Sequence, residues 1–282
     1  APYKRSFGPL PGEIFHAQFP NALHGTSVEA ALASVASILA SDIAPEDVAA
    51  FIIEPVQGEG GFNITPPAFL QALRGLADRH GILLIADEVQ GGMARTGRML
   101  SIEHAGVTPD LVTLAKGLAG GFPLSAVVGK ARIMDAAHAG GLGGTYAGNP
   151  LAVAAANAVL DVIAEEGLCA RAEVVGATMK ARLSAIAARP EGQAIADIRG
   201  LGAMVAFELV TDRASMAPAS EATYRIVAEA EVRGLIILAC GTRGNVIRLL
   251  PALTIPEAHL DEALDLLEAS ILAVIAPATV PA

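Results

Sequence analysis

Three charged residues lie where strand-like apolar runs end: Glu54 in FIIEPVQGEGG, Asp87 in ILLIADEVQGG and Lys116 in LVTLAKGLAGG. In an open parallel sheet, ligands bind beyond the carboxyl ends of the strands. One charged residue at such a place is most simply solvated. Three strand ends that carry a charge and are followed by glycine indicate a shared site, built from two carboxylates and one amine.

Lys116 has the most specific chemistry of the three. The chain has four lysines, at positions 4, 116, 130 and 180, and only Lys116 combines a buried strand with a flexible glycine-rich segment behind it. A buried lysine loses its proton more readily, and a neutral amine can attack a carbonyl to form a Schiff base. Asp87 on a neighbouring strand end could keep a ring nitrogen protonated. The pair therefore indicates pyridoxal 5'-phosphate (PLP) as the cofactor.

A P-loop ATPase and a metal site compete with this interpretation. Apolar residues followed by Asp87 and Glu88 resemble the strand that helps to hold magnesium in ATPases, but that site needs a loop of the form GxxxxGK[ST]. The segment GFPLSAVVGKA has Leu124 where a glycine is required and Ala131 where a hydroxyl is required. The six histidines form no i, i+4 pair, and neither cysteine has a second ligand beside it, so a metal site is not favoured. The ATPase stays open as the alternative outside the PLP-dependent class.

Composition argues against several other classes of protein. The net charge of −10 and the pI of about 5.1 argue against nucleic acid as a partner. No apolar stretch reaches the roughly 20 residues that a membrane-spanning helix needs. Cys169 and Cys240 cannot form a disulfide framework, and no export signal opens the chain, so we expect a cytoplasmic protein.

Alternating strand-length and helix-length segments predict an α/β fold. Because the strand runs are apolar throughout, we expect a mostly parallel sheet that is covered on both faces. The expected strands are at about 50–56, 82–87, 111–115 and 125–129, and the expected helices are at about 27–41, 66–80 and 131–139.

The pattern changes after long helices over about 150–189. Strands are then expected at 203–210, 235–239 and 246–250, and helices at about 221–233 and 257–274. With a boundary near Gly167, residues 1–167 are predicted to form part of a large cofactor-binding domain. Residues 168–282 are predicted to form a smaller α+β domain.

Several motifs together resemble one known family. The segments EPVQGEGG, LIADEVQGGMARTGR, PDLVTLAKGLAGGFPL, GGLGGTYAGNPLA and IRGLGAMVAFEL are similar, in this order, to motifs of the class III (omega) aminotransferases of PLP fold type I. Within that family, GTYAGNP and ILACGTRGNVIRLLPALTI most resemble the 4-aminobutyrate aminotransferases. The similarity runs over essentially the whole chain. It implies the fold type I large domain, with its mostly parallel sheet, and a smaller C-terminal domain.

The resemblance implies a role for each matching residue of the cofactor site. Lys116 would bond to the cofactor aldehyde and carry the proton, and Asp87 would pair with the pyridinium nitrogen. Val89 would pack against the ring, and Gln90 would hydrogen-bond the phenolic oxygen. Thr145 would reach the cofactor phosphate in the partner subunit, which implies a homodimer with shared sites. Glu88 matches no cofactor role, and we expect it to be structural.

Two further residues would select the substrate. Arg248, inside the apolar run VIRLLPAL, is costly to bury unless it is paired, and an edge-strand arginine with its head in water is the simpler interpretation. The resemblance implies that Arg248 grips the α-carboxylate of glutamate, and that Glu59 neutralises Arg248 when an ω-amino substrate is bound. The implied reaction is transamination between 4-aminobutyrate and 2-oxoglutarate, giving succinate semialdehyde and glutamate. 5-Aminovalerate, β-alanine and acetylornithine stay open as amino donors.

Family members are expected to carry a further segment before Ala1. That segment would supply the phosphate-binding loop, an aromatic residue that stacks on the ring and an arginine for the distal carboxylate, and none of these can be assigned in this chain. An inactive fragment therefore remains an alternative. Without the strands of such a segment, we expect an uncovered sheet edge or apolar face.

Overall fold

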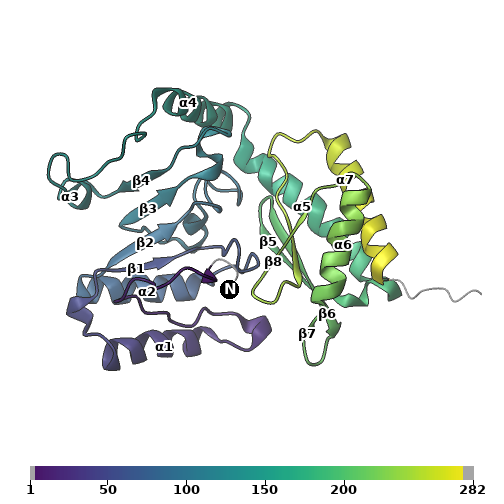
Figure 1. Ribbon diagram of the computed structural model, residues 1–282, viewed down its shortest axis with the longest axis horizontal. Coiled ribbons are helices and arrows are strands. Elements are labelled where there is room, and N and C mark those ends of the chain that lie inside the picture. The colour runs from purple at the N-terminus through teal and green to yellow at the C-terminus, as the bar shows by residue number, and fades with distance from the viewer. Residues whose placement is uncertain (1–3, 276–282) are drawn as a thin grey trace, which may run out of the picture.

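The computed structural model describes residues 4–275, which form two sheets lying side by side with helices packed against them (Figure 1). The first sheet has the order β1 (Ala50–Ile53), β2 (Leu83–Asp87), β3 (Leu111–Leu114) and β4 (Ala126–Gly129). The first three strands are parallel, and β4 is antiparallel to β3. All four expected strands are present, and the expectation of a mostly parallel sheet is confirmed.

Helices α1 (Val28–Ser41) and α2 (Pro67–His80) match the sequence-based expectation closely. The Ser27 side chain accepts a hydrogen bond from the Ala30 N–H at 3.1 Å and so caps α1. Helix α3 ends at Met134 (Ala131–Met134), so the expected helix over 131–139 is too long. Residues 135–139 are not helical, and the glycine-rich segment begins after them, at Gly140.

One face of the first sheet is covered within residues 4–275. Leu84 and Ala86 of β2 and Val112 of β3 are buried there against Leu70 of α2. The opposite face is more open: Ile52 is 65% exposed. Coverage on both faces was therefore a wrong expectation for the described residues, whereas the expected uncovered apolar surface is found.

Asp110, just before β3, connects three neighbouring elements although it is only 2% exposed. Its carboxylate accepts hydrogen bonds from Leu84 N at 2.9 Å, Arg74 Nη1 at 2.6 Å and Lys130 Nζ at 2.7 Å. Desolvation acts to raise the pKa of Asp110, but these hydrogen bonds outweigh it and hold the pKa well below its usual range. Lys130, whose side chain is 43% exposed, thus has a structural partner.

Replacing Asp110 with asparagine should lower the free energy of unfolding at pH 7 by about 3–5 kcal/mol, because Arg74, Lys130 and Arg132 would lose a buried partner. The low pKa in the folded state means that the carboxylate stabilises the fold above its ordinary pKa, and that this stability is lost as the pH falls. Urea unfolding at pH 7 and in mild acid would measure both effects. Asp78→Asn is the matched control, because Asp78 pairs with the same Arg74 but is 66% exposed; an equal loss in both variants would contradict the prediction.

The second sheet is antiparallel and is built from β5 (Ile195–Leu201), β6 (Met204–Asp212), β9 (Val246–Leu249) and β8 (Leu238–Cys240), in that order, with β7 (Ala217–Pro218) beside β6. Helices α5 (Leu168–Ala187), α6 (Ser220–Val232) and α7 (Glu257–Ile275) lie on the side of this sheet away from the first sheet (Figure 1). Helix α4 (Pro150–Glu165) precedes them. The expected strands are found as β6, β8 and β9, whereas β5 and β7 were not predicted.

Alternation along β6 gives the second sheet two buried faces. Val205, Phe207 and Leu209 pack toward the helices, whereas Met204 and Ala206 pack against the segment that follows β1. This second contact joins the two sheets.

Gly167, between α4 and α5, stays our proposed boundary between a domain over 1–167 and a domain over 168–282. Within residues 4–275, no helix combines the length and apolar character needed to cross a membrane.

Candidate active site

The carboxyl ends of β1, β2 and β3 bring three of the predicted site residues to one edge of the first sheet. Asp87 ends β2 and pairs in register with Thr113 of β3, and Lys116 follows Thr113 by three residues. Glu54 comes directly after β1. Because these strands are parallel neighbours, the side chains share one edge, as the sequence predicted.

The charges at this edge act on one another. The pKa of Glu54 is raised overall, mainly by burial. The Gly58 N–H, which donates to Glu54 Oε2 at 2.7 Å, opposes this shift. Nearby Asp87 adds to the shift, whereas Lys116 opposes it. Glu59 also raises this pKa. The two carboxylates and the amine of the predicted site, together with Glu59, therefore form one electrostatic cluster.

Lys116 begins a short 3-10 turn (Lys116–Ala119) with a φ of 48°. For a residue other than glycine, this left-handed conformation costs about 1–3 kcal/mol and is found most often at functional sites. Leu118 and Ala119 of the same turn are buried and hold it in place. The Lys116 side chain itself is exposed. The expectation of a buried lysine is therefore wrong for the described part of the chain. The reason is that no described residue covers this end of β3.

Val89 and Gln90 extend the same edge. The Val89 N–H donates to Asp87 Oδ1 at 3.0 Å and so fixes the carboxylate. The Gln90 side chain lies against Gly58, where an added Cβ would come within 2.7 Å of the Gln90 amide. Gln90 Oε1 is buried and has no hydrogen-bond partner among the described residues. Oε1 can only accept a hydrogen bond, so it fits a donor; a ring oxygen such as the phenolic oxygen of PLP would take its hydrogen bond from the Nε2 group of the same amide.

Glu59 and Arg248 meet across the two sheets. Arg248 lies on β9, an interior strand between β6 and β8, and its Nη1 forms an ion pair with Glu59 Oε1. The Arg248 side chain is 16% exposed and the Glu59 side chain is 44% exposed. The interpretation of Arg248 as a solvated edge-strand residue is therefore wrong, and the partner is the residue that the family resemblance implied.

Thr145 lies in a turn outside the helices and strands of the structure. It belongs to the exposed segment between α3 and α4. Two large apolar side chains of the same segment are also exposed, Leu142 at 76% and Tyr146 at 87%. Exposed apolar side chains in one segment are typical of a surface that contacts another molecule.

Glu88, next to Asp87, has a structural environment. It is 1% exposed, and its carboxylate accepts hydrogen bonds from Ser101 N at 2.9 Å, Ser101 Oγ at 2.5 Å and Ile102 N at 2.7 Å. Burial raises its pKa, although these hydrogen bonds oppose the shift. The prediction that Glu88 is structural agrees with these contacts.

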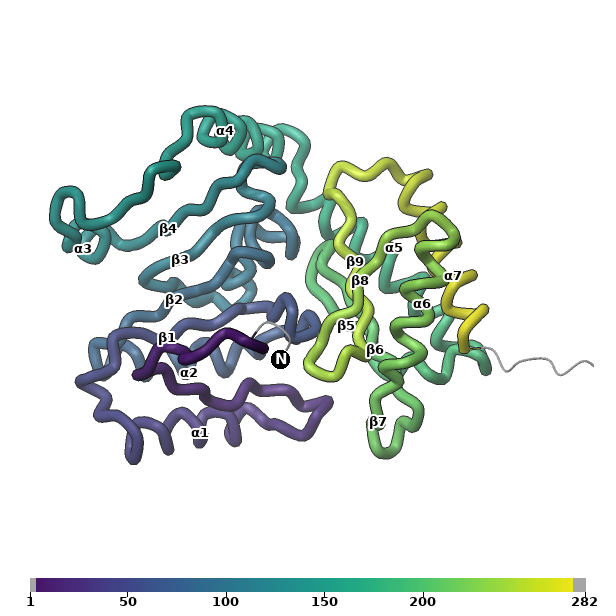
Figure 2. The backbone as a smooth tube through the Cα atoms, viewed as in Figure 1, coloured from purple at the N-terminus to yellow at the C-terminus, as the bar shows by residue number. Residues whose placement is uncertain are grey.

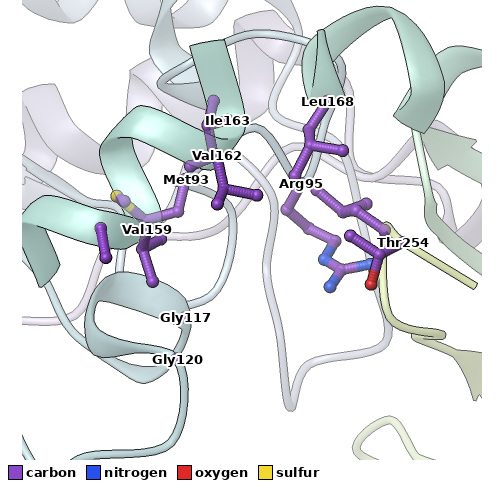
Figure 3. Close-up of a pocket in the computed structure, with 11 residues that line it drawn as sticks. Met93, Arg95, Gly117, Gly120, Val159, Val162, Ile163, Leu168 and Thr254 are labelled. Atoms are coloured by element: carbon purple, nitrogen blue, oxygen red, sulfur yellow. The ribbon is translucent and has the colours of Figure 1, made fainter. Parts of the chain in front are cut away.

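A pocket of 390 Å³ lies behind the Lys116–Ala119 turn (Figure 3). Its walls are mostly apolar and include Val159 and Val162 of α4. Arg95 is its charged residue; burial lowers the pKa of Arg95 to about 10, and its Nη1 donates to the Pro251 carbonyl at 2.6 Å. Neither Lys116 nor Asp87 lines this pocket, so it lies beside the predicted site and does not contain it.

The parallel strands, the charged strand ends and the separate antiparallel sheet agree with the expected fold type I of PLP-dependent transferases. The comparisons agree. A family model described as aminotransferase class-III matches residues 1–271, and the chain belongs to this family. Among the residues that the structure describes, no group of three histidine, cysteine or acidic side chains could hold a metal ion.

Two curated relatives and one solved structure illustrate the similarity. The chain is 52% identical over 266 residues to a 5-aminovalerate aminotransferase of Pseudomonas aeruginosa, and 51% identical over 267 residues to a 4-aminobutyrate aminotransferase of Escherichia coli. Each match covers 94% of this chain and 62% of the relative, so the chain spans 62% of the length of these relatives. A PLP-bound amine transaminase from an uncultivated Pseudomonas species superposes with a TM-score of 0.87 at 34% identity, covering 96% of this chain and 64% of that one.

These findings confirm the class III family, the fold class and PLP as the cofactor of the family. They also make the ATPase interpretation wrong. The roles of the individual site residues stay predictions.

Proposed function

We propose that the protein carrying this chain is an ω-aminotransferase that moves the amino group of 4-aminobutyrate to 2-oxoglutarate, giving succinate semialdehyde and glutamate. The observation that carries the proposal is the Glu59–Arg248 ion pair, which lies next to the charged cluster at the strand ends. Arg248 can be paired with Glu59 or left free to bind a substrate carboxylate. This suits 4-aminobutyrate and glutamate, which differ by one carboxylate.

Each residue of the cofactor site has a different proposed role. When bound, PLP supplies an electron sink for the carbon that loses its proton. The Lys116 amine holds the cofactor and moves the proton, and the Asp87 carboxylate, fixed by the Val89 N–H, keeps the ring nitrogen protonated. The Nε2 group of Gln90 donates to the phenolic oxygen, and the Val89 side chain packs on the ring.

Arg248 and Glu59 allow the two half-reactions to share one site. With glutamate or 2-oxoglutarate bound, the Arg248 guanidinium binds the α-carboxylate and the Glu59 side chain moves away. With 4-aminobutyrate bound, no carboxylate lies there. Glu59 then returns to Arg248 and cancels a charge that would otherwise be left unpaired in a partly buried place.

The amino donor distinguishes this proposal from its alternatives, which are 5-aminovalerate, β-alanine and acetylornithine. 5-Aminovalerate is longer than 4-aminobutyrate by one methylene, which is worth only about 1–3 kcal/mol of discrimination in an apolar pocket. Turnover of all four donors with 2-oxoglutarate by the full-length, PLP-loaded protein decides between them. Failure of the 282-residue chain to bind PLP would favour the inactive fragment.

Replacing Glu59 with glutamine should slow the 4-aminobutyrate half-reaction on the order of 10-fold, because a charge-assisted pair worth about 1.5–3 kcal/mol is lost. The glutamate half-reaction should change little, since Glu59 is displaced there. Single-turnover rates with each donor measure the two effects separately. Glu257→Gln serves as the control, because Glu257 forms an exposed ion pair with Arg171; equal slowing of both half-reactions by Glu59→Gln would argue against the proposed role.

We also propose a homodimer in which Thr145 reaches the cofactor phosphate of the partner subunit. The exposed apolar side chains Leu142 and Tyr146 near Thr145 support an interface in this segment.

A cytoplasmic location is supported by the two free cysteines, Cys169 and Cys240. Burial raises the pKa of Cys240 to about 11, which keeps it in the unreactive thiol form.

A further inference from the structure

The segment that carries Glu59 is attached to the second sheet at two backbone positions. This segment, residues 56–64 and here named the Glu59 loop, begins and ends at the Val56–Ile64 bridge and reaches toward the second sheet (Figure 2). The Gly241 N–H donates to the Glu59 carbonyl at 3.0 Å. Arg199 Nε donates to the Gly61 carbonyl at 2.8 Å. The backbone that directly follows the Glu59 Cα is therefore held by the domain that carries Arg248.

Arg199 is held in place by carboxylates of its own sheet. Its Nη1 donates to Glu208 Oε2 at 2.9 Å and to Asp197 Oδ2 at 2.6 Å. Its side chain is 12% exposed, and Glu208 is 2% exposed. Glu208 also contacts His24 Nε2 at 2.9 Å and accepts from Asn245 Nδ2 at 3.2 Å. These contacts fix the planar guanidinium so that its Nε points at the loop.

Arg199 approaches the loop closely at Gly61, where the backbone conformation favours a glycine. Gly61 has a φ of 112°, and a Cβ added there would lie 3.2 Å from Arg199 Nη2 and 3.4 Å from Val246 Cγ2. Phe62, the next residue, is fully buried against the second sheet. The contact is thus part of a buried, packed interface between the loop and the second sheet.

We propose that Arg199 is a positioning residue that sets the preference between ω-amino and α-amino substrates, because it holds the Glu59 loop where the Glu59 carboxylate reaches Arg248. The inference rests on the proposed function. Arg248 lies on a rigid interior strand, whereas Glu59 lies on a loop and is 44% exposed. Fixing the loop lowers the entropy that the ion pair loses when it forms. The exchange between substrates is then confined to rotation of the Glu59 side chain, while its backbone stays anchored.

The test is a comparison of half-reactions in the full-length, PLP-loaded protein carrying Arg199→Lys. Lysine keeps the positive charge for Glu208 but lacks the planar fork that donates to the carboxylates and the Gly61 carbonyl together. The ratio of kcat/KM for the preferred ω-amino donor to kcat/KM for glutamate should fall about 10-fold, with most of the change in the ω-amino half-reaction. Arg213→Lys is the matched control, because Arg213 donates to the backbone carbonyls of Gln193 and Ile195, away from the loop.

A double-mutant cycle separates positioning from general stability. In the Glu59→Gln background, Arg199→Lys should no longer change the substrate ratio, because the group that it positions is absent. Asp197→Asn, a milder variant that removes one partner of Arg199, should change the ratio in the same direction by less. It keeps the test decisive if Arg199→Lys does not fold.

The outcomes distinguish the two proposals. If the wild-type protein turns over glutamate but no ω-amino donor, the proposed function fails. If the wild-type protein uses both donors but the variants slow both half-reactions equally, or if the effects of Arg199→Lys and Glu59→Gln simply add, the positioning role of Arg199 is overturned.

Discussion

Replacing Lys116 with alanine should abolish the visible absorbance band of the bound cofactor and lower the rate of transamination by about 10²–10⁴-fold, the usual contribution of a positioned proton carrier. The φ of 48° and the position three residues beyond Thr113 place the amine at the edge that also carries Asp87 and Glu54. Absorbance spectra and single-turnover rates of the purified full-length variant measure the two effects.

Lys180→Ala is the control for this experiment, because Lys180 lies on α5 and its Nζ contacts only the Gly200 carbonyl, at 3.4 Å, among the contacts described. It should leave the band and the rate unchanged. Partial recovery of the Lys116→Ala rate by added methylamine would show that a missing amine, and not a damaged fold, causes the loss. An unchanged band in Lys116→Ala would exclude this lysine.

Replacing Asp87 with asparagine should slow both half-reactions by about 10²-fold, corresponding to about 3 kcal/mol for the loss of one partner of a charge pair. Asparagine can still accept the hydrogen bond that the Val89 N–H now donates to Asp87 Oδ1, so the local backbone should be preserved. It cannot stabilise a protonated ring nitrogen. The effect should therefore appear in rates with both donors and not in their ratio.

The neighbouring residue provides the matched comparison. Glu88→Gln should lower the melting temperature, because Ser101 and Ile102 lose a buried carboxylate partner, but should leave the single-turnover rates of the folded protein nearly unchanged. The reverse pattern, with activity lost at position 88 and retained at position 87, would mean that the roles of the two acids have been exchanged.

The predicted residues that the structure brings to one sheet edge share a physical reason. Glu54, Asp87 and Lys116 each follow a buried apolar strand, and parallel strands bring their carboxyl ends to one edge whatever the helices between them do. The partner of Arg248 was also identified, although 189 residues separate it from Glu59. That pairing came from resemblance to a family, because no local pattern links a loop glutamate to an arginine on another sheet.

The features that the sequence did not reveal depend on contacts between distant segments. Strand β5 was not predicted because Asp197 and Arg199 interrupt its apolar pattern. Asp197 pairs with Arg199 on the same strand, and Arg199 gains its second carboxylate, Glu208, only when β6 lies beside β5. Asp110 carries no signal of burial either, since its three donors come from α2, β2 and the segment after β4. The exposure of Lys116 was missed because an apolar strand predicts burial for the strand and not for the residue beyond its end.

Borohydride reduction of the PLP-loaded full-length protein, followed by peptide mapping with mass spectrometry, is the most direct test of the proposed cofactor site. Reduction makes the bond between the cofactor and its lysine permanent. The cofactor should be found on the peptide that contains Lys116, and this labelling should be lost in Lys116→Ala. Labelling of Lys130 or Lys180 instead, or reduced protein that carries no cofactor, would contradict the assignment of the strand ends as the site of PLP.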